Sequence, residues 1–240
     1  MARTIALFGA GGGMGQAVAR RFGREGYRVA LVARRREPLD ELVATLAAEG
    51  IEAAGFTVDL RRTGEVPALV AEIRKRFGRI DVLNYAPFTP AALTTAADLD
   101  AAELREWANL YLLTPVELVN QVLPEMLERG NGGILFVYGS SVIIPAAGVS
   151  GPVPLMAAAR NYILTLHQEV AGRGVYAGGL AVRALIARSQ TDQAVQGGEL
   201  KLNMELPTVE PDELADLEWR LMRTRDRADV LYPAPPRDGA

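Results

Sequence analysis

The sequence predicts an α/β protein built on one doubly wound parallel sheet. Short apolar runs alternate along the chain with longer segments of helical periodicity. A glycine-rich turn directly follows the first apolar run and opens a helical segment. No Pro- or Ser-rich linker interrupts the 240 residues. Residues 1–240 are therefore expected to form a single domain with one sizeable core.

Each expected element follows from one of these runs. Strands are expected at residues 4–9, 28–33, within 51–60, and at 80–86, 132–141, 175–182 and 230–232. Helices are expected at residues 14–26, 37–50, 65–78, 98–129 with a break near 101–103, and 154–174. Right-handed crossovers between such strands give the order 3-2-1-4-5-6-7, with helices on both faces. The tail after residue 232 is expected to be disordered.

Composition narrows the possible functions. The chain has 26 basic and 29 acidic residues and a net charge of −3, so neither a nucleic acid nor a membrane is expected as a partner. It has no cysteine and one histidine, so no metal site is expected. The first apolar run gives way to glycines too early for a signal peptide, and a cytoplasmic location is expected.

The first motif is "GAGGGMG", residues Gly9–Gly15. Glycines between a strand and a helix allow a tight turn and the close approach of a pyrophosphate to backbone N–H groups. Gly9, Gly13, Met14 and Gly15 are therefore expected to contact the phosphates of a dinucleotide. The alternative is a strand-to-helix turn with incidental glycines.

Arginines follow the second strand, where the adenosine ribose of such a dinucleotide should lie. An acidic residue there would bind the ribose hydroxyls of NAD, whereas the planar guanidinium fork suits a 2′-phosphate. Arg34 is the first candidate and Arg35 the second. The expected cofactor is thus NADP(H), although a solvated basic turn is an alternative explanation for these arginines.

Further landmarks follow along the chain. They are Asp59–Leu60 after the third strand, "LNYA" at 83–86, Asn109 within a helical segment, and "GSSV" at 139–142. In order and spacing, these landmarks and the glycine loop resemble the short-chain dehydrogenase/reductase family along nearly the whole chain. The resemblance implies a Rossmann-like fold and hydride transfer between a nicotinamide cofactor and a small-molecule substrate.

The resemblance also implies roles for individual residues. It places Asp59 and Leu60 at the adenine, and Asn84 and Ala86 along the ribose side. Ile186, after the sixth strand, is a further expected cofactor contact.

Within the catalytic set, the resemblance makes Ser141 the hydrogen-bond donor to the substrate, with Ser140 the other choice. Asn109 is expected to hold a water molecule or the helix geometry.

The chain departs from the family where the chemistry lies. The family's Tyr-x-x-x-Lys falls on Met156-x-x-x-Arg160. Methionine has no proton to give, so Met156 is expected to be an apolar wall beside the reacting carbon. Arg160 is expected to bind the nicotinamide ribose hydroxyls. The alternative for this pair is core packing for Met156 and a surface charge for Arg160.

Other side chains do not fill the vacant acid role. Tyr138, Tyr162 and His167 are expected to be packing residues. Without a tyrosine, suitable substrates are those whose reduction needs no immediate protonation, such as an iminium ion or an enone. Residues 185–210 are expected to form a substrate lid, but they carry no motif that names the substrate.

The sequence therefore predicts an NADP(H)-binding oxidoreductase with an atypical active site. The alternatives are a cofactor-binding regulator or scaffold, and a non-redox isomerase or cyclase. A homodimer or homotetramer is expected, because residues 98–129 and 155–173 carry more apolar side chains than one face against a sheet can bury.

Overall fold

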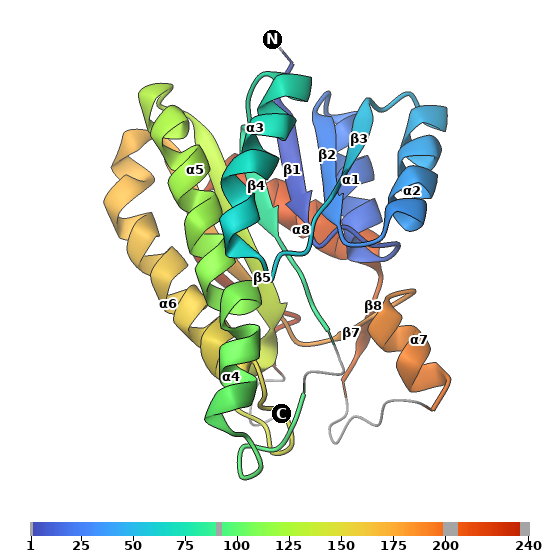
Figure 1. Cartoon of the computed structure of the whole chain (residues 1–240), viewed down its shortest axis with the longest axis vertical. Helices are drawn as coiled ribbons and strands as arrows, with labels where there is room; N and C mark the ends of the chain where they lie inside the picture. Colours follow the sequence, from blue (N-terminus) through green and yellow to red (C-terminus); the bar gives the residue numbers. More distant parts are fainter. Residues whose placement is uncertain (1, 90–92, 199–205, 236–240) are drawn as a thin grey trace.

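The computed structural model describes residues 2–89, 93–198 and 206–235 of the chain (Figure 1). A parallel sheet of seven strands has the order β3-β2-β1-β4-β5-β6-β9. Its strands are β1 (Thr4–Phe8), β2 (Arg28–Ala33), β3 (Ala53–Thr57), β4 (Val82–Tyr85), β5 (Gly132–Gly139), β6 (Val175–Val182) and β9 (Asp229–Tyr232). The predicted sheet and strand order are confirmed, with β9 as the seventh strand.

Helices cover both faces of this sheet (Figure 1). One face carries α1 (Met14–Arg24), α2 (Arg36–Ala48) and α8 (Pro211–Thr224). The other carries α3 (Val66–Phe77), which follows a short 3₁₀ turn, together with α5 (Thr114–Glu128) and α6 (Val153–Val170). The sequence analysis assigned no helix to residues 211–224, although this segment has the apolar stripe that packs against α1.

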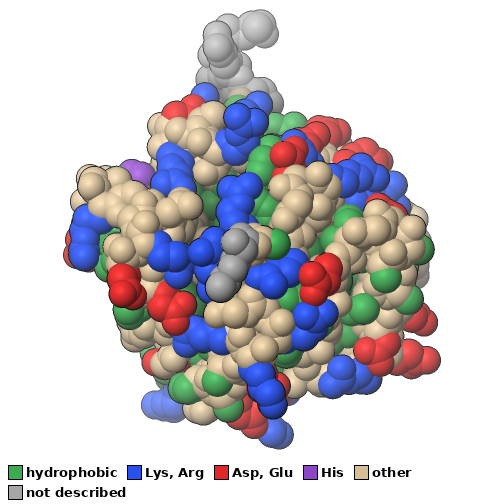
Figure 2. All heavy atoms as spheres, turned by 90° about the horizontal axis from the view of Figure 1, so that it is seen from above, with side chains coloured by type: hydrophobic (Ala, Val, Ile, Leu, Met, Phe, Trp, Pro, Cys, Tyr) green, Lys and Arg blue, Asp and Glu red, His purple; other side chains and the backbone are tan. Residues whose placement is uncertain are grey.

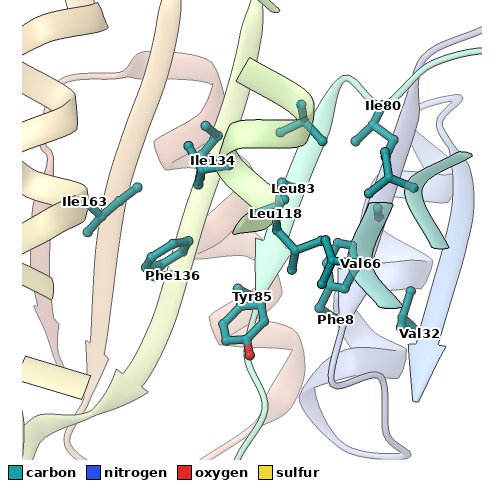
Figure 3. Close-up of a cluster of buried hydrophobic side chains, with 14 of the residues drawn as sticks. Phe8, Val32, Val66, Ile80, Leu83, Tyr85, Leu118, Ile134, Phe136 and Ile163 are labelled. Atoms are coloured by element: carbon teal, nitrogen blue, oxygen red, sulfur yellow. The ribbon is translucent and has the colours of Figure 1, made fainter. Parts of the chain in front are cut away.

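The core explains why the strands read as continuous apolar runs. Ile5 and Leu7 of β1 face α1 and α8, whereas Ala6 and Phe8 face α3 and α5. Figure 3 shows the second layer, where the Phe8 ring lies among side chains from neighbouring strands and helices. A parallel sheet covered on both faces needs apolar residues on both sides of each strand.

The long helical segment differs from its prediction. A break was expected near residues 101–103, but α4 (Ala101–Ala108) begins there, and Asp100 caps it by accepting hydrogen bonds from the backbone N–H groups of residues 102 and 103. The irregularity is instead a π-turn, η3 (Asn109–Leu113). Pro115 follows this turn and has no N–H to donate, which disfavours regular α-helical bonding there.

Short elements follow β6. Strands β7 (Leu185–Ile186) and β8 (Thr208–Val209) pair with each other outside the main sheet, and α7 (Gln190–Gln196) lies between them in the chain. Residues 199–205 of the predicted lid and residues 236–240 of the predicted disordered tail lie outside the described residues. None of the helices in the described part of the chain combines the length and apolar composition needed to cross a bilayer.

Lys and Arg side chains gather on the face that bears the amino ends of the strands (Figure 2). Several of these arginines bind backbone carbonyls where helices end and strands begin. Arg28 donates to Ala2 O at 2.9 Å, Arg129 to Ile80 O at 3.0 Å and Arg225 to Gly174 O at 2.8 Å. These arginines therefore stabilise the loops at the edge opposite to the carboxyl ends of the strands.

Candidate functional site

A cavity of about 420 Å³ lies at the carboxyl ends of the central strands. Ligands bind at this edge in doubly wound sheets because the strand order reverses there. One side of the cavity is the glycine loop between β1 and α1. The others are the end of β5, the start of α6, and the segment from Ala184 to Gln193.

Close packing at the glycine loop excludes a side chain at Gly9 and leaves little space for one at Gly13. Gly9 has a φ of +91°, and a Cβ there would lie 2.7 Å from the backbone of Pro87. A Cβ on Gly13 would lie 3.2 Å from the Cα of Ser189. The loop thus runs between the end of β4 and the segment before α7. Its amide groups precede α1, which has no acidic residue in its first turn, so this end of the helix suits a phosphate.

Arg34 and Arg35 lie at the carboxyl end of β2, and both side chains are exposed. Asp59, after β3, is half-buried and held by Arg61, whose Nη2 lies 2.7 Å from Oδ2. The hydrogen bond from Arg61 lowers the pKa of Asp59, and the Arg34 charge contributes to the same shift. Arg34 and Asp59 therefore share one neighbourhood, as the resemblance implies, but neither lines the cavity.

The expected ribose-side residues divide into two groups. Ala86 and Ile186 line the cavity. Asn84 is buried, and its amide donates to Oε2 of Glu218 on α8 at 2.7 Å, so its side chain does not line the cavity. Leu60 is buried, and its carbonyl accepts a hydrogen bond from Thr114 at 2.7 Å.

The serine pair and Met156 meet in the cavity. Ser140 and Ser141 form the turn after β5, and both line the cavity wall. Met156 is 5% exposed and lines the same cavity, one turn into α6. The structure thus brings together a hydroxyl donor and an apolar thioether at the place where the family resemblance puts the serine and the tyrosine.

Arg160 does not line the cavity. Its Nε lies 3.2 Å from Oδ1 of Asp229 at the start of β9, and its Nη2 contacts Oδ2. This paired contact takes two of the three guanidinium nitrogens. Within the described residues, Nη1 has no protein partner, and Nη2 keeps a second N–H.

Tyr138 lies between this ion pair and the cavity. Its ring lines the cavity, but its hydroxyl is buried over Gly179 of β6, where a Cβ would come within 1.8 Å of it. Burial raises the pKa of Tyr138, and the Asp229 carboxylate raises it further. A buried phenol with a raised pKa is a poor proton donor. The predicted packing role suits this geometry.

Asn109, His167 and Tyr162 each contact a neighbouring element. Asn109 lies in the π-turn and donates from Nδ2 to the carbonyl of Arg61 at 2.7 Å. The ring nitrogen Nδ1 of His167 lies 3.0 Å from the Ala177 carbonyl oxygen. The Tyr162 ring packs on Phe136.

Sequence reasoning missed part of the cavity and the partner of Arg160. The missed lining residues include Phe88, Leu93, Val149, Val153 and Arg188. Val149 and Val153 could have been found from their position just before Met156. Asp229 gave no such signal, because it is 69 residues from Arg160 and belongs to no motif.

Comparisons with known proteins agree with this geometry. Residues 3–187 match the family model described as short chain dehydrogenase. The chain is 31% identical over 177 residues to the ketoacyl reductase HetN of Nostoc, covering 72% of this chain and 60% of that protein. It is 28% identical over 176 residues to human dehydrogenase/reductase SDR family member 4, covering 73% and 63% respectively. These alignments span less than two thirds of the relatives' own length.

Solved structures share the fold. An actinorhodin polyketide ketoreductase solved with NADPH has a TM-score of 0.81 and 24% identity, with 96% of this chain and 95% of that chain covered. L-Sorbose reductase from Gluconobacter frateurii, complexed with NADPH and L-sorbose, has a TM-score of 0.80 and 22% identity, with 96% and 94% covered. The family match over residues 3–187, the sheet order and the glycine loop lead to one conclusion: the chain belongs to the short-chain dehydrogenase family.

Proposed function

We propose that the protein is an NADP(H)-dependent oxidoreductase that transfers hydride to or from a small organic molecule without a tyrosine acid. Family membership supports the reaction type. Similar structures solved with NADPH support the cofactor, and the name of a similar ketoacyl reductase supports a reduction. The observation that carries the proposal is Met156 in the cavity wall beside Ser140 and Ser141.

The residues present fit this cofactor. The turn at Gly9 leaves no room for a Cβ and is tight at Gly13, and it precedes the N-terminus of α1, which suits a diphosphate. Arg34 is exposed at the end of β2, where a 2′-phosphate would be gripped by its planar fork. Ala86 and Ile186 would border the nicotinamide half. When bound, the cofactor supplies or accepts the hydride.

The chain's own residues would orient the substrate through a hydrogen bond to its oxygen, but they would supply no acidic proton from the tyrosine position. Ser141 would donate a hydrogen bond to that oxygen, with Ser140 as the other candidate. Met156 would pack against the reacting carbon as an apolar wall. It would not act as an acid, because a thioether has no proton to transfer. General acid help is worth about 10²–10⁴-fold, whereas positioning of donor and acceptor can be worth more. Acceptors that need no immediate proton, such as iminium ions and enones, are therefore favoured over simple ketones.

Arg160 would donate to the cofactor through Nη1 or the second N–H of Nη2, because Asp229 takes the Nε N–H and one N–H of Nη2. Its role at the nicotinamide ribose remains part of the proposal. The same ion pair also favours a second candidate function, a cofactor-binding protein without redox activity. The reason is that Arg160, at the family's lysine position, is paired with Asp229 and so joins α6 to β9.

Titration of NADPH fluorescence, followed by NADPH consumption with ketones, enones and imines, tests the proposal. Submicromolar to micromolar binding with turnover of an enone or imine is expected. Binding without turnover of any acceptor would favour the non-redox candidate. Product formation with the cofactor unchanged would point to an isomerase or cyclase, and no binding would refute the cofactor assignment.

A further inference from the structure

We infer that, of the acceptors proposed above, the substrate part of the cavity selects an uncharged, largely apolar one with a carbonyl oxygen, and that it rejects carboxylates. This inference rests on the proposed function, because it names the substrate class of the same site. Its evidence is the chemistry of the side chains around the serine pair and the hydrogen bonding at the start of α6.

The wall around the serines is apolar. Val142, Val149, Val153 and Met156 line the cavity together with the two serines, and Phe88, which is 41% exposed, is a further apolar lining residue. Burying apolar substrate surface against these side chains would favour binding. An ionised carboxylate placed among them would lose its hydration and gain no cationic partner, which disfavours its binding.

A charged side chain lines the cavity on the segment that packs against the glycine loop. Among the described lining residues, Arg188 is the one charged side chain. It precedes Ser189, which packs against Gly13 of the phosphate-suited loop. Its Nη2 also lies 3.0 Å from Oε2 of Glu210. Arg188 is thus partly neutralised by Glu210 and is next in the chain to the residue that packs on the glycine loop.

The N-terminus of α6 does not offer an anion site in its place. The backbone N–H groups of Leu155 and Met156 both donate to the Pro152 carbonyl at 3.0 Å. Val153 N–H donates to the Ser150 carbonyl at 3.4 Å, and Pro154 has no N–H. The first turn therefore has none of the free donors with which helix N-termini bind anions. The polar side chains that remain in the cavity lining are neutral. They are the hydroxyls of Ser140 and Ser141 and, around α7, the side chains of Ser189, Gln190, Thr191 and Gln193.

Calorimetric titration with para-acetylbenzoate methyl ester and with para-acetylbenzoate tests the inference. Both ligands are measured with the protein free and with NADP⁺ bound, so no hydride transfer is required. The ester is expected to bind at least tenfold more tightly than the carboxylate in each form that binds either. Equal affinity, tighter binding of the carboxylate, or binding of neither ligand in both forms would overturn the inference. Failure of NADP⁺ itself to bind would instead refute the proposed function.

A charge placed in the wall provides the second arm. Val149→Lys should bring the affinity for the carboxylate up to or above that for the ester, because the ammonium group supplies the missing partner. Ala68→Lys, on the exposed face of α3 outside the cavity lining, is the matched control and should leave the ratio unchanged. If Val149→Lys does not fold, Val149→Thr takes its place and should lower the ratio of ester affinity to carboxylate affinity by less than twofold. The same ratio in the unmutated protein then decides the inference.

Discussion

Arg160 of α6 and Asp229 of β9 form an ion pair at the position where the family resemblance implies the catalytic lysine. The pair is about one quarter exposed on each side, at 26% and 28%. It connects the last strand of the sheet to the helix that carries Met156. The same contact thus joins the sheet edge to α6 and uses two of the five guanidinium N–H donors of Arg160.

Asp229→Asn should destabilise the protein by about 1–3 kcal/mol, because it leaves Arg160 half-buried without its counterion. Urea unfolding of this variant, of Arg160→Met and of the double variant gives the coupling free energy, expected at about 1–2 kcal/mol. The matched control is Asp216→Asn, which breaks the more exposed Arg21–Asp216 pair and should cost less than about 0.5 kcal/mol. Equal losses for the two pairs would mean that the Arg160 pair has no special structural role.

Arg34→Ala should raise the Kd for NADPH about tenfold or more and leave the Kd for NADH within about twofold, since only NADPH carries the 2′-phosphate. Arg35→Ala should have a smaller effect in the same direction. Arg36→Ala is the control, because it removes a neighbouring arginine that is exposed on α2 and whose Nη1 lies 3.8 Å from Oδ1 of Asp40. Equal weakening of both cofactors by Arg34→Ala, or no weakening, would show that this arginine is a solvent residue.

Glu218 should make the stability depend on pH. Burial raises its pKa to about 8 from 4.5, since Oε1 has no partner and Asn84 binds only Oε2. The folded state therefore favours the protonated carboxyl. Its contribution is complete below about pH 4.5 and is lost as the pH rises to about 8. At about 1.4 kcal/mol per pKa unit, the loss amounts to several kcal/mol at most.

Glu218→Gln removes this titration and should match the unmutated protein near pH 5 but exceed its stability above pH 8. Urea unfolding at several pH values measures the difference between the two. Glu72→Gln, on the exposed face of α3, controls for loss of a carboxylate. If the difference in unfolding free energy between Glu218→Gln and the unmutated protein stays constant with pH, Glu218 does not cause the pH dependence.

The protein should assemble into a homodimer or homotetramer through α5 and α6. Leu123 and Leu127 of α5 and Leu155 and Leu164 of α6 are only partly buried against the core. Such faces bury more apolar surface when paired with a symmetry mate. Light scattering that reports only a species of 25.8 kDa would contradict this expectation.

The fold could be predicted from the sequence because the periodicity of each strand and helix can be read within a short segment. The right-handedness of crossovers then restricts the strand order. Each buried strand reads as an apolar run, and the glycine loop marks the first crossover. The π-turn at residues 109–113 was missed because an apolar helical stripe does not show where one extra residue enters a turn. Helix α8 has a clear stripe, but it lies beyond the last landmark of the family resemblance.

The site was only partly predictable. Glycine, serine and Met156 positions follow from spacing along single strands and helices, and the structure brings them to one cavity. The orientation of Asn84 toward Glu218, 134 residues away, depends on tertiary packing. So does the capture of Arg160 by Asp229. Pairings between distant segments leave no periodic signal in one sequence.

Restoring the family's acid pair tests the central claim most directly. In Met156→Tyr with Arg160→Lys, Asp229 should still attract the new lysine ammonium, so ketone reduction should rise only slightly. Adding Asp229→Asn should free the lysine and raise kcat/KM for a simple ketone by at least tenfold over the double variant, measured as NADPH consumption.

The unmutated protein is the reference, and it should reduce an enone but not the ketone. If the unmutated protein reduces the ketone at a rate that the triple variant does not exceed, another acid serves the site and the assignment of Met156 is wrong.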